Sequence, residues 1–432
     1  MNYSQATHFL FNSFPSYQNV GSQAYKEGIM GITEMCHYLG DPQKNYFTIH
    51  VAGTNGKGSV SHMLASVLQQ AGYCVGLFTS PHLLDFRERI RVNGECISEK
   101  EVVKFTDTHK EKMVELGLSF FEMTTAMAFD HFANSDVEVA VIETGLGGRL
   151  DSTNIITPIL SVITNIGLEH TAMLGNTIAE IAFEKAGIIK KGVPAVVGES
   201  APESDEVFRQ MAEVCGSELV FADREWEVLE CEPSAESVRY TLQRGRDGRT
   251  QILDLDLQGA YQRKNILTVR TAVSLLRHRT HLNISTRALV EGLRVVCEST
   301  GLMGRWHVLH NAPLAVCDTG HNAHGLAEVV QQITQQSYEK LFVVIGVVND
   351  KDIDSIVPLM PQDAYYIFTQ SSVRRALPAE ALAEVFVREG FKGEVVQGVP
   401  AAYQRALELA SADDMIFVGG STFVVADLLT DQ

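Results

Sequence analysis

Short apolar runs alternate along this chain with longer segments in which apolar residues recur every three or four positions. A stripe with helical spacing is formed by Val60, Met63, Leu64, Val67 and Leu68. It lies between the first two of four runs that are typical of buried strands in a parallel sheet, at 47–51, 75–78, 137–142 and 159–164. The strand, helix and strand over 47–78 predict a parallel pair joined by a right-handed crossover.

The segments around these strands are predicted to be mainly helical at first and more strand-rich later. Residues 1–44 form a helical lead-in that contains a helix over 25–39 and stops at 40–42. Strand-like segments cover 219–221 and 226–256. A helix is predicted after 258–265, and on one face it would present both Gln262 and Asn265, which lie three residues apart.

Beyond a turn at 299–305, strands and helices alternate strictly. The predicted strands are 314–317, 341–345, 365–368, 394–396 and 415–418, and the predicted helices lie near 325–337, 352–359, 379–389 and 400–410. This order predicts a small, open, parallel α/β domain. We therefore expect two domains, 1–298 and 299–432.

Composition and charge exclude several classes of partner. The 432 residues carry a formal net charge of −18. Binding to nucleic acid or to an anionic membrane needs a basic surface, so we expect neither. Small anionic substrates remain possible, because a few local lysines and arginines are enough to bind them.

The seven cysteines are scattered, odd in number and without C-x-x-C spacing. This distribution favours reduced thiols in a cytoplasmic protein over a disulfide framework or a zinc site. The N-terminus has no signal-peptide pattern, and no apolar run is long enough to span a bilayer. We expect a soluble cytoplasmic protein.

A glycine-rich segment joins the first predicted strand to the first predicted helix. It consists of Gly53, Thr54, Asn55, Gly56, Lys57, Gly58 and Ser59. Glycines let backbone N–H groups approach a phosphate, the helix N-terminus adds partial positive charge, and Lys57 adds a full charge. Gly58 departs from the usual spacing, because it separates the lysine from the serine. The segment predicts a phosphate-binding loop rather than a plain structural turn.

Polar residues follow the other predicted strands at the edge where ligands bind in such sheets. Ser80 follows the second strand, Glu143 ends the third, and His170 comes a few residues after the fourth. An acidic residue at a strand end beside a phosphate loop commonly faces a metal ion. His170 is either a satisfied polar residue or a functional one.

Two further features leave alternatives open. The charged segment 83–98 is either a solvated hairpin around its Asn-Gly pair or a substrate loop whose arginines meet an anionic ligand. Thr177 and Glu180 form a capping box that opens a helix. Lys185 falls on the apolar stripe of this helix, so it either snorkels to the surface or is held inside a site.

In the second domain, three predicted strand ends carry glycines and polar residues. They are 318–322, 346–352 and 419–421. Together they predict a site at one edge of this domain, between the two domains.

Taken in order, these motifs resemble the folylpolyglutamate synthases, within the wider family of amide ligases that build peptidoglycan precursors. The matching segments are 53–59, 79–83, 87–90, 143–151, 184–187 and 318–322. The match runs over essentially the whole chain. The extra Gly58 fits the folate branch better than the cell-wall branch.

The resemblance implies an ATP-dependent ligase with an N-terminal P-loop ATPase domain and a smaller C-terminal Rossmann-like domain. Such enzymes join L-glutamate to dihydropteroate and add glutamates to tetrahydrofolate and its polyglutamates through an acyl phosphate. ATP and Mg²⁺, the latter at two sites, are the implied cofactors. We expect a monomer, and the segment 149–151 favours dihydropteroate as one substrate.

The resemblance also assigns roles by motif position. ATP would be bound by residues 53–59 together with Asn265, Arg305, Asp318 and His321. The magnesium ligands would be Ser80, Glu143 and His170, although histidine is unusual for so hard a cation. Lys185 matches a lysine carried as a carbamate, and Lys57, Lys185 and His170 would serve catalysis. Substrate binding would fall to His82, Arg87, Asp151 and Ser421.

The chain departs from the family pattern at two positions, because Met303 and Ala323 stand where the family usually has proline. These changes concern loop backbone more than chemistry. Two alternatives remain: a cell-wall ligase that uses a nucleotide-linked peptide, and a nucleotide-dependent switch that performs no ligation. The polar strand ends of the second domain weigh against a switch, which needs no acceptor site.

Overall fold

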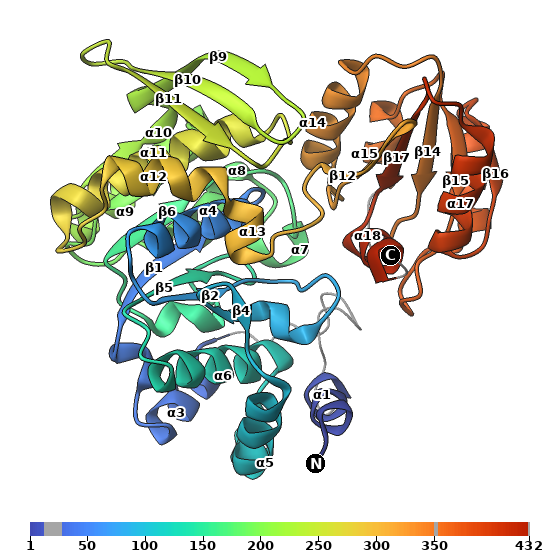
Figure 1. Cartoon of the computed structure of the whole chain (residues 1–432). Coiled ribbons are helices and arrows are strands. Elements are labelled where there is room, and N and C mark those ends of the chain that lie inside the picture. Colours follow the sequence, from blue (N-terminus) through green and yellow to red (C-terminus); the bar gives the residue numbers. More distant parts are fainter. Residues whose placement is uncertain (13–27, 350–352, 431–432) are drawn as a thin grey trace. The chain divides into compact units, whose positions relative to one another are not determined.

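The computed structural model describes residues 1–12, 28–349 and 353–430. The chain divides into two compact units (Figure 1). The first comprises Met1–Asp256 with Gln262–Leu302, and the second comprises Leu257–Tyr261 with Met303–Gln432. The division falls within the predicted turn at 299–305, but the second unit also recruits 257–261, which the sequence did not indicate. Parts of the predicted 25–39 and 352–359 helices lie outside the described residues.

The first unit is built on an eight-stranded sheet with the order β4-β3-β2-β5-β1-β6-β7-β8. Its strands are β1 (Phe47–Ala52), β2 (Val75–Phe78), β3 (Ile90–Val92), β4 (Glu95–Cys96), β5 (Val139–Glu143), β6 (Leu160–Ile163), β7 (Ala195–Val197) and β8 (Leu219–Phe221). All are parallel except the hairpin of β3 and β4, which pairs antiparallel with β2. The hairpin around the Asn-Gly pair at 93–94 is confirmed.

The predicted pairing of β1 with β2 is wrong. Both strands run parallel, but β5 lies between them and pairs with each. The crossover through α4 (Lys57–Gln70) therefore skips one position in the sheet, which β5 fills later in the chain. A βαβ unit fixes the direction of its two strands but does not require them to be neighbours.

Helices cover the sheet, and the most buried of them follows the glycine-rich segment. The others are α1 (Tyr3–Asn12), α3 (Met30–Tyr38), α5 (Glu99–Glu115), α6 (Phe120–Asn134), α7 (Thr171–Leu174), α8 (Ile178–Ala186), α9 (Pro202–Cys215), α10 (Ala222–Glu225), α11 (Gln262–Arg279), α12 (Thr286–Arg294) and α13 (Val296–Thr300), with 3₁₀ turns η2 (Pro42–Lys44), η3 (Phe86–Arg89) and η4 (Ser152–Ile155). Ser59 to Leu68 of α4 are all buried. Ser66 Oγ donates to the carbonyl of Gly292 in α12 at 2.6 Å, which holds the two helices in close approach.

A separate three-stranded antiparallel sheet, β11-β10-β9, completes the first unit (Figure 1). Its strands are β9 (Trp226–Pro233), β10 (Val238–Arg244) and β11 (Thr250–Leu255). Tyr240 and Leu242 are buried on one face, as the alternation of β10 requires. The predicted strand character of 226–256, with a turn near 244–248, is confirmed.

The second unit has a six-stranded sheet with the order β12-β13-β17-β14-β15-β16. Its strands are β12 (His307–Asn311), β13 (Leu314–Cys317), β14 (Leu341–Ile345), β15 (Tyr365–Phe368), β16 (Lys392–Val395) and β17 (Met415–Gly419). Its helices are α14 (Ala323–Thr334), α15 (Ile353–Ile356), α16 (Ala379–Arg388), α17 (Val399–Leu409) and α18 (Thr422–Thr430), with one 3₁₀ turn, η5 (Val357–Leu359).

The predicted wholly parallel sheet is wrong at one edge. β12 pairs antiparallel with β13, because the two residues between them allow only a hairpin. β12 could not be recognised from the sequence, since its residues are half-buried or exposed and form no apolar run. The other five strands are parallel, as predicted. In the described part of the chain, the helices are too short or too polar to span a membrane.

Candidate active site

The glycine-rich segment connects β1 to α4, as predicted, and its last three residues already belong to the helix. Gly53 and Gly56 have φ angles of +150° and +82°, which side chains other than glycine rarely adopt. A Cβ on Gly53 would lie 1.8 Å from Thr164 Oγ1, and one on Gly56 would lie 2.4 Å from Asn265 Oδ1. The segment therefore fits against its neighbours only because both positions are glycine. Gly58 and Ser59 lie in the first turn of α4.

Residues after β6 hold this loop in place through its backbone. Thr54 N donates to the carbonyl of Asn165 at 3.0 Å, and Asn55 N donates to Asn165 Oδ1 at 2.8 Å. Asn165 Nδ2 in turn donates to Glu199 Oε1 at 2.9 Å, and Glu199 Oε2 lies 3.0 Å from Lys264 Nζ. Sequence reasoning missed Glu199 and Lys264, which no motif marks.

The predicted face of α11 is confirmed. Asn265 Nδ2 donates to Gln262 Oε1 at 2.7 Å, and Gln262 Nε2 donates to Ser59 Oγ at 3.2 Å. Asn265 also lies against Gly56. The first turn of α11 thus contacts the middle of the glycine-rich segment and its last residue.

Lys185 is held inside the first unit and does not snorkel. Its side chain is buried, with 4% of the residue exposed, on the C-terminal turn of α8. Lys185 Nζ donates to the carbonyl of Gly53 at 2.8 Å. Burial, together with the positive charge of Lys57, lowers the pKa of Lys185 to about 7. A substantial fraction of this amine is therefore neutral near physiological pH.

Lys57 bends back over the loop from the start of α4. Its Nζ donates to the carbonyls of Gly53 and Thr54 at 3.0 and 3.1 Å. The two lysine amines thus converge at the position where the loop would meet a phosphate.

Two of the predicted metal ligands meet at the neighbouring strand ends. Glu143 is buried at the end of β5, and its Oε2 accepts a hydrogen bond from Ser80 N at 2.9 Å. The hydroxyl of Thr144, the next residue, is buried and has no hydrogen-bond partner in the described part of the chain. A buried carboxylate and hydroxyl oxygens are the donors that magnesium prefers, so these residues fit that ion.

His170, the third predicted metal ligand, lies after β6. Its φ is +53°, and it precedes α7. His170 Nε2 is 3.8 Å from Glu169 Oε1. Among the described residues, no three His, Cys, Asp or Glu side chains form a group that could hold a metal. The metal role of His170 stays a prediction.

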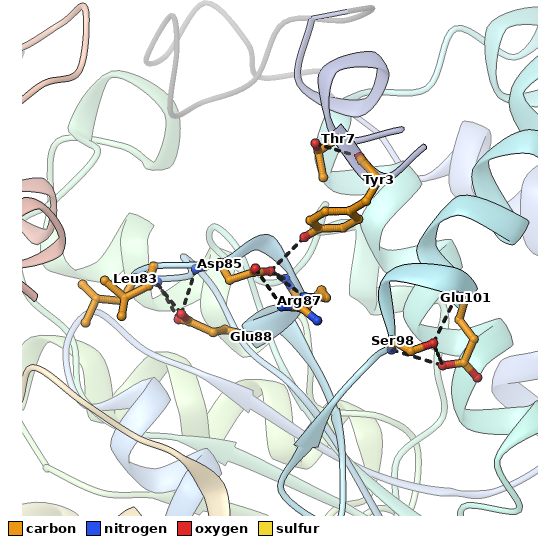
Figure 2. Close-up of polar contacts among 9 residues, drawn as sticks. Tyr3, Thr7, Leu83, Asp85, Arg87, Glu88, Ser98 and Glu101 are labelled. Carbon is orange, nitrogen blue, oxygen red and sulfur yellow. Dashed lines mark hydrogen bonds and ion pairs between the residues drawn. The ribbon is translucent and has the colours of Figure 1, made fainter. Parts of the chain in front are cut away.

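The segment after β2 carries the predicted substrate residues His82 and Arg87, and Figure 2 shows Arg87 beside Asp85. Arg87 forms an ion pair with Asp85, at 3.0 Å from Nε to Oδ1. His82 Nδ1 accepts from the buried Arg89 Nε at 2.8 Å, so its acceptor nitrogen is used within the protein. Burial and the charge of Arg89 lower the pKa of His82 to about 3, which keeps the ring neutral.

Asp151 organises the glycine-rich segment that follows β5. Its carboxylate is buried and accepts from Leu146 N at 2.8 Å and from Thr153 N at 3.0 Å. Burial raises its pKa above the ordinary value. Thr153 Oγ1 also lies 2.8 Å from Nε2 of the buried His50, a contact that the sequence did not predict. The observed bonds of Asp151 are structural, and its substrate role stays a prediction.

In the second unit, Asp318 follows β13 and is fully engaged. Its carboxylate accepts from the Tyr261 hydroxyl, Trp306 N and Gly320 N, each at 2.7 Å. Burial raises its pKa above the ordinary value, despite these bonds. The bond to Tyr261 explains why 257–261 belongs to this unit.

The other predicted residues of the second unit lie on the same loops or one strand away. Arg305 donates to Thr319 Oγ1, and His321 Nδ1 lies 2.9 Å from the carbonyl of Thr319. Ser421 is buried after β17, which pairs with β13, and its Oγ accepts from Phe423 N at 3.2 Å. Polar residues thus follow these strands of the second unit, as predicted. The strand-end segment 346–352 lies partly outside the described residues.

Two domain families match this chain. Residues 51–273 match the Mur ligase middle domain, and residues 304–422 match the glutamate ligase domain of Mur ligases. The first match alone covers more than half of the chain.

Relatives with known names align with most or all of the chain. It is 30% identical to the folylpolyglutamate synthase of Lacticaseibacillus casei, over 98% of this chain and 100% of that protein. It is 35% identical to the dihydrofolate synthase/folylpolyglutamate synthase of Bacillus subtilis, over 82% of this chain and 85% of the relative. It is also 34% identical to a probable bifunctional folylpolyglutamate synthase/dihydropteroate synthase of Haloferax volcanii, of which it spans 50%.

Solved structures agree with these relatives. The structure of E. coli FolC in complex with DHPP and ADP has a TM-score of 0.85 and 28% identity, over 100% of this chain and 97% of that chain. The Mycobacterium tuberculosis folylpolyglutamate synthase complexed with ADP has a TM-score of 0.86 and 28% identity, over 99% of this chain and 97% of that chain.

Proposed function

This chain belongs to the family of folylpolyglutamate and dihydrofolate synthases, and we propose that it joins L-glutamate to 7,8-dihydropteroate and to reduced folates. It is an ATP-dependent ligase. ATP is converted to ADP and phosphate, and the product is an amide. The Mur ligases form the wider superfamily, so a cell-wall substrate is the second candidate.

The observation that carries the proposal is the convergence of polar groups at the carboxyl ends of β1, β2 and β5. The phosphate loop, the Ser80–Glu143 pair and the two lysine amines all lie there. A carboxylate cannot form an amide in water without activation, because it has no good leaving group. A site that holds the phosphates of ATP beside a metal-binding carboxylate supplies that activation.

The proposed reaction has two steps. A carboxylate oxygen of the pterin acceptor attacks the γ-phosphorus of ATP, and the bond to the β–γ bridging oxygen breaks, which releases ADP. The amine of glutamate then attacks the acyl carbon, loses a proton, and phosphate leaves. Both nucleophiles belong to substrates, so the protein positions them and neutralises charge.

Lys57 and the loop N–H groups are the proposed phosphate ligands. Lys57 Nζ donates to the carbonyls of Gly53 and Thr54, so its ammonium group is held beside the loop. Asn265 and Gln262 support the loop from α11. Arg305, Asp318 and His321 are proposed to contact the nucleotide from the second unit, and Ser421 to contact substrate.

Magnesium is proposed to bind at Glu143 and Ser80, with His170 as a further ligand and a second ion nearby. When bound, the metal would offset the negative charge of the phosphates. Glu143 is held for this role by its bond from Ser80 N. This bond fixes the direction of the carboxylate at the end of β5.

Lys185 is proposed to carry a carbamate. Carbamylation requires a neutral amine, whose lone pair attacks CO₂ with release of a proton. The pKa of about 7 favours that form. The resulting anion would replace the repulsion between Lys185 and Lys57 with attraction.

The finer assignments extend this proposal. The complex of E. coli FolC with DHPP supports an acceptor of that kind for this chain. We propose that the residues after β2 and around Asp151 bind it. We further propose a monomeric, cytoplasmic enzyme that acts on both dihydropteroate and tetrahydrofolate polyglutamates.

Phosphate release from MgATP and L-glutamate tests the proposal, with dihydropteroate, tetrahydrofolate or no acceptor. Phosphate release with both pterins is the expected result. Release with tetrahydrofolate alone would show that the chain lacks dihydrofolate synthase activity. Lys57→Ala should lower turnover by roughly 100-fold or more. Near-normal turnover of this variant, or no release with either pterin, would overturn the proposal.

A further inference from the structure

Helix α1 contacts the segment that follows β2 at both of its ends. At its start, the Tyr3 hydroxyl donates to Asp85 Oδ1 at 2.8 Å (Figure 2). At its end, the Phe11 ring stacks on that of Phe120 with centroids 4.7 Å apart, and lies edge-on to the His82 ring at 5.9 Å. The proposed reaction assigns no role to this helix.

The contact with Tyr3 falls on an already organised loop. Asp85 accepts from Arg87 N at 2.8 Å and from the Arg87 guanidinium at 3.0 Å through both Nε and Nη2. Glu88 accepts from the backbone N–H groups of Leu83, Leu84 and Asp85 at 2.7 to 2.9 Å (Figure 2). These two carboxylates fix the backbone of 83–88.

Tyr3 contacts both members of the Asp85–Arg87 ion pair. The Arg87 guanidinium lies 5.5 Å from the centroid of the Tyr3 ring, so the ring covers the ion pair while its hydroxyl bonds to the carboxylate. Burial favours the neutral form of Asp85, but the hydrogen bonds from Arg87 and Tyr3 outweigh it and lower the pKa of Asp85 below its ordinary value. Asp85 is therefore a charged acceptor for the Tyr3 hydroxyl.

This loop lies directly between residues of the candidate site. Ser80, whose N–H bonds to Glu143, lies shortly before the 83–88 loop. Arg89, which donates to His82 Nδ1 at 2.8 Å, directly follows it. Arg87 is also engaged by Asp85 and Tyr3, which argues for a supporting role rather than direct contact with substrate. A shift of 83–88 would move His82 and change the direction of the segment after Ser80.

We propose that Tyr3 of helix α1 is a positioning residue for the pterin acceptor, acting through Asp85 and the 83–88 loop. The inference rests on the proposed function, in which the segment after β2 binds the acceptor. Tyr3 supports acceptor binding and not ATP binding, because the contacts of its side chain with the described residues are to Asp85 and Arg87 in the segment after β2.

Tyr3→Phe is the test, because it removes the hydroxyl and keeps the ring that covers Arg87. Tyr38→Phe is a matched control, since Tyr38 is also in the first unit and has a cation near its ring. Among the described residues, its hydroxyl makes only a long contact of 3.4 Å to His109, and the edge-on contact of its ring with His109 is kept in the variant. We expect the KM for dihydropteroate to rise by about three- to tenfold in Tyr3→Phe, while the KM for ATP stays within about twofold. Tyr38→Phe should leave both unchanged.

Hydrogen exchange gives a second readout that needs no turnover. The amides of Leu83, Leu84 and Asp85 should exchange faster in Tyr3→Phe than in the unsubstituted protein. If the unsubstituted protein released no phosphate with pterins, the proposed function would fail while the exchange comparison still judged the Tyr3 contact. Unchanged exchange together with an unchanged acceptor KM would overturn the inference.

A parallel rise in the KM for ATP would also overturn it, because the effect would then be general. Asp85→Asn provides a second variant if Tyr3→Phe folds poorly. It keeps an acceptor for Tyr3 but removes the charge that holds Arg87. The same selective rise in the acceptor KM is expected, and a normal acceptor KM would contradict the proposal.

Discussion

Lys57 and Lys185 donate hydrogen bonds to the same acceptor, the carbonyl oxygen of Gly53, at 3.0 and 2.8 Å. Two ammonium groups on one oxygen repel each other, and Lys185 is the more buried of the two. The repulsion adds to burial in lowering the pKa of Lys185 to about 7. A charge on the phosphate loop thus adds to the effect of burial on a lysine that lies more than a hundred residues away in the sequence.

Removal of the Lys57 charge should raise the pKa of Lys185. In Lys57→Met the repulsion disappears but burial remains, so we expect a pKa above 7 and still below that of an exposed lysine. NMR titration of ¹⁵N-labelled lysine side chains measures it directly. Lys100→Met, which removes an exposed lysine, is the control and should not change the value. An identical pKa in Lys57→Met and the parent would contradict the prediction.

The same shift predicts how stability depends on pH. The folded pKa of about 7 lies below the ordinary value of 10.5, so between these pH values the unfolded chain holds a proton that the folded chain lacks. The contribution of Lys185 to the free energy of unfolding should therefore rise with pH across this window, by at most about 1.4 kcal/mol per unit, and be lost as pH falls through 7. Urea unfolding of the parent and of Lys185→Met at several pH values measures it. Parallel curves for the two proteins would refute the prediction.

The elements that carry this site were predictable because they depend on local pattern. Apolar runs placed β1, β2, β5 and β6, and their carboxyl ends placed Ser80 and Glu143 at one edge of a sheet. Helical spacing put Lys185 on the apolar stripe of α8, although periodicity could not decide whether it was buried. Motif order supplied the remaining candidate residues.

Contacts between segments that are distant in the chain could not be predicted from the sequence. The position of β5 between β1 and β2 depends on which strand completes the sheet, and no local signal encodes it. The contacts of Glu199 with Asn165 and of Tyr3 with Asp85 join side chains far apart in the chain. Such residues look like ordinary surface charges and aromatics until the fold brings their partners to them.

Nucleotide binding should require glycine at position 56 for two reasons, its positive φ angle and the lack of space for a side chain. Gly56 and Gly72 have φ angles of +82° and +93°, so alanine strains both, by about 1 kcal/mol. A Cβ at Gly72 would meet nothing within 4 Å, whereas one at Gly56 would meet Asn265 Oδ1 at 2.4 Å. Both variants should lose similar stability from strain, but only Gly56→Ala should also weaken ATP binding, by roughly tenfold or more. Isothermal titration with ATP separates them, and equal affinities would show that the contact with Asn265 is unimportant.

Glu143 and Glu138 form a natural comparison for the proposed metal site, since Glu143 ends β5 and Glu138 directly precedes its first residue. Each accepts a backbone N–H from a residue that flanks β2: Glu143 from Ser80 at 2.9 Å and Glu138 from Cys74 at 2.8 Å. Glutamine preserves an acceptor oxygen for either bond and removes only the charge. Only Glu143, however, is buried beside the phosphate loop. The charge should therefore matter at one end of the strand and not at the other.

Glu143→Gln should lower turnover by roughly 100-fold or more and raise the magnesium concentration needed for half-maximal rate. Glu138→Gln should match the parent in both measurements, because its carboxylate is exposed to solvent at the far end of the strand. Thermal unfolding without magnesium distinguishes a damaged fold from a lost metal site. Both variants keep their hydrogen bonds and should unfold near the temperature of the parent protein. If Glu143→Gln showed the parent dependence on magnesium, the charge at the end of β5 would serve the local structure and the metal would have to bind elsewhere.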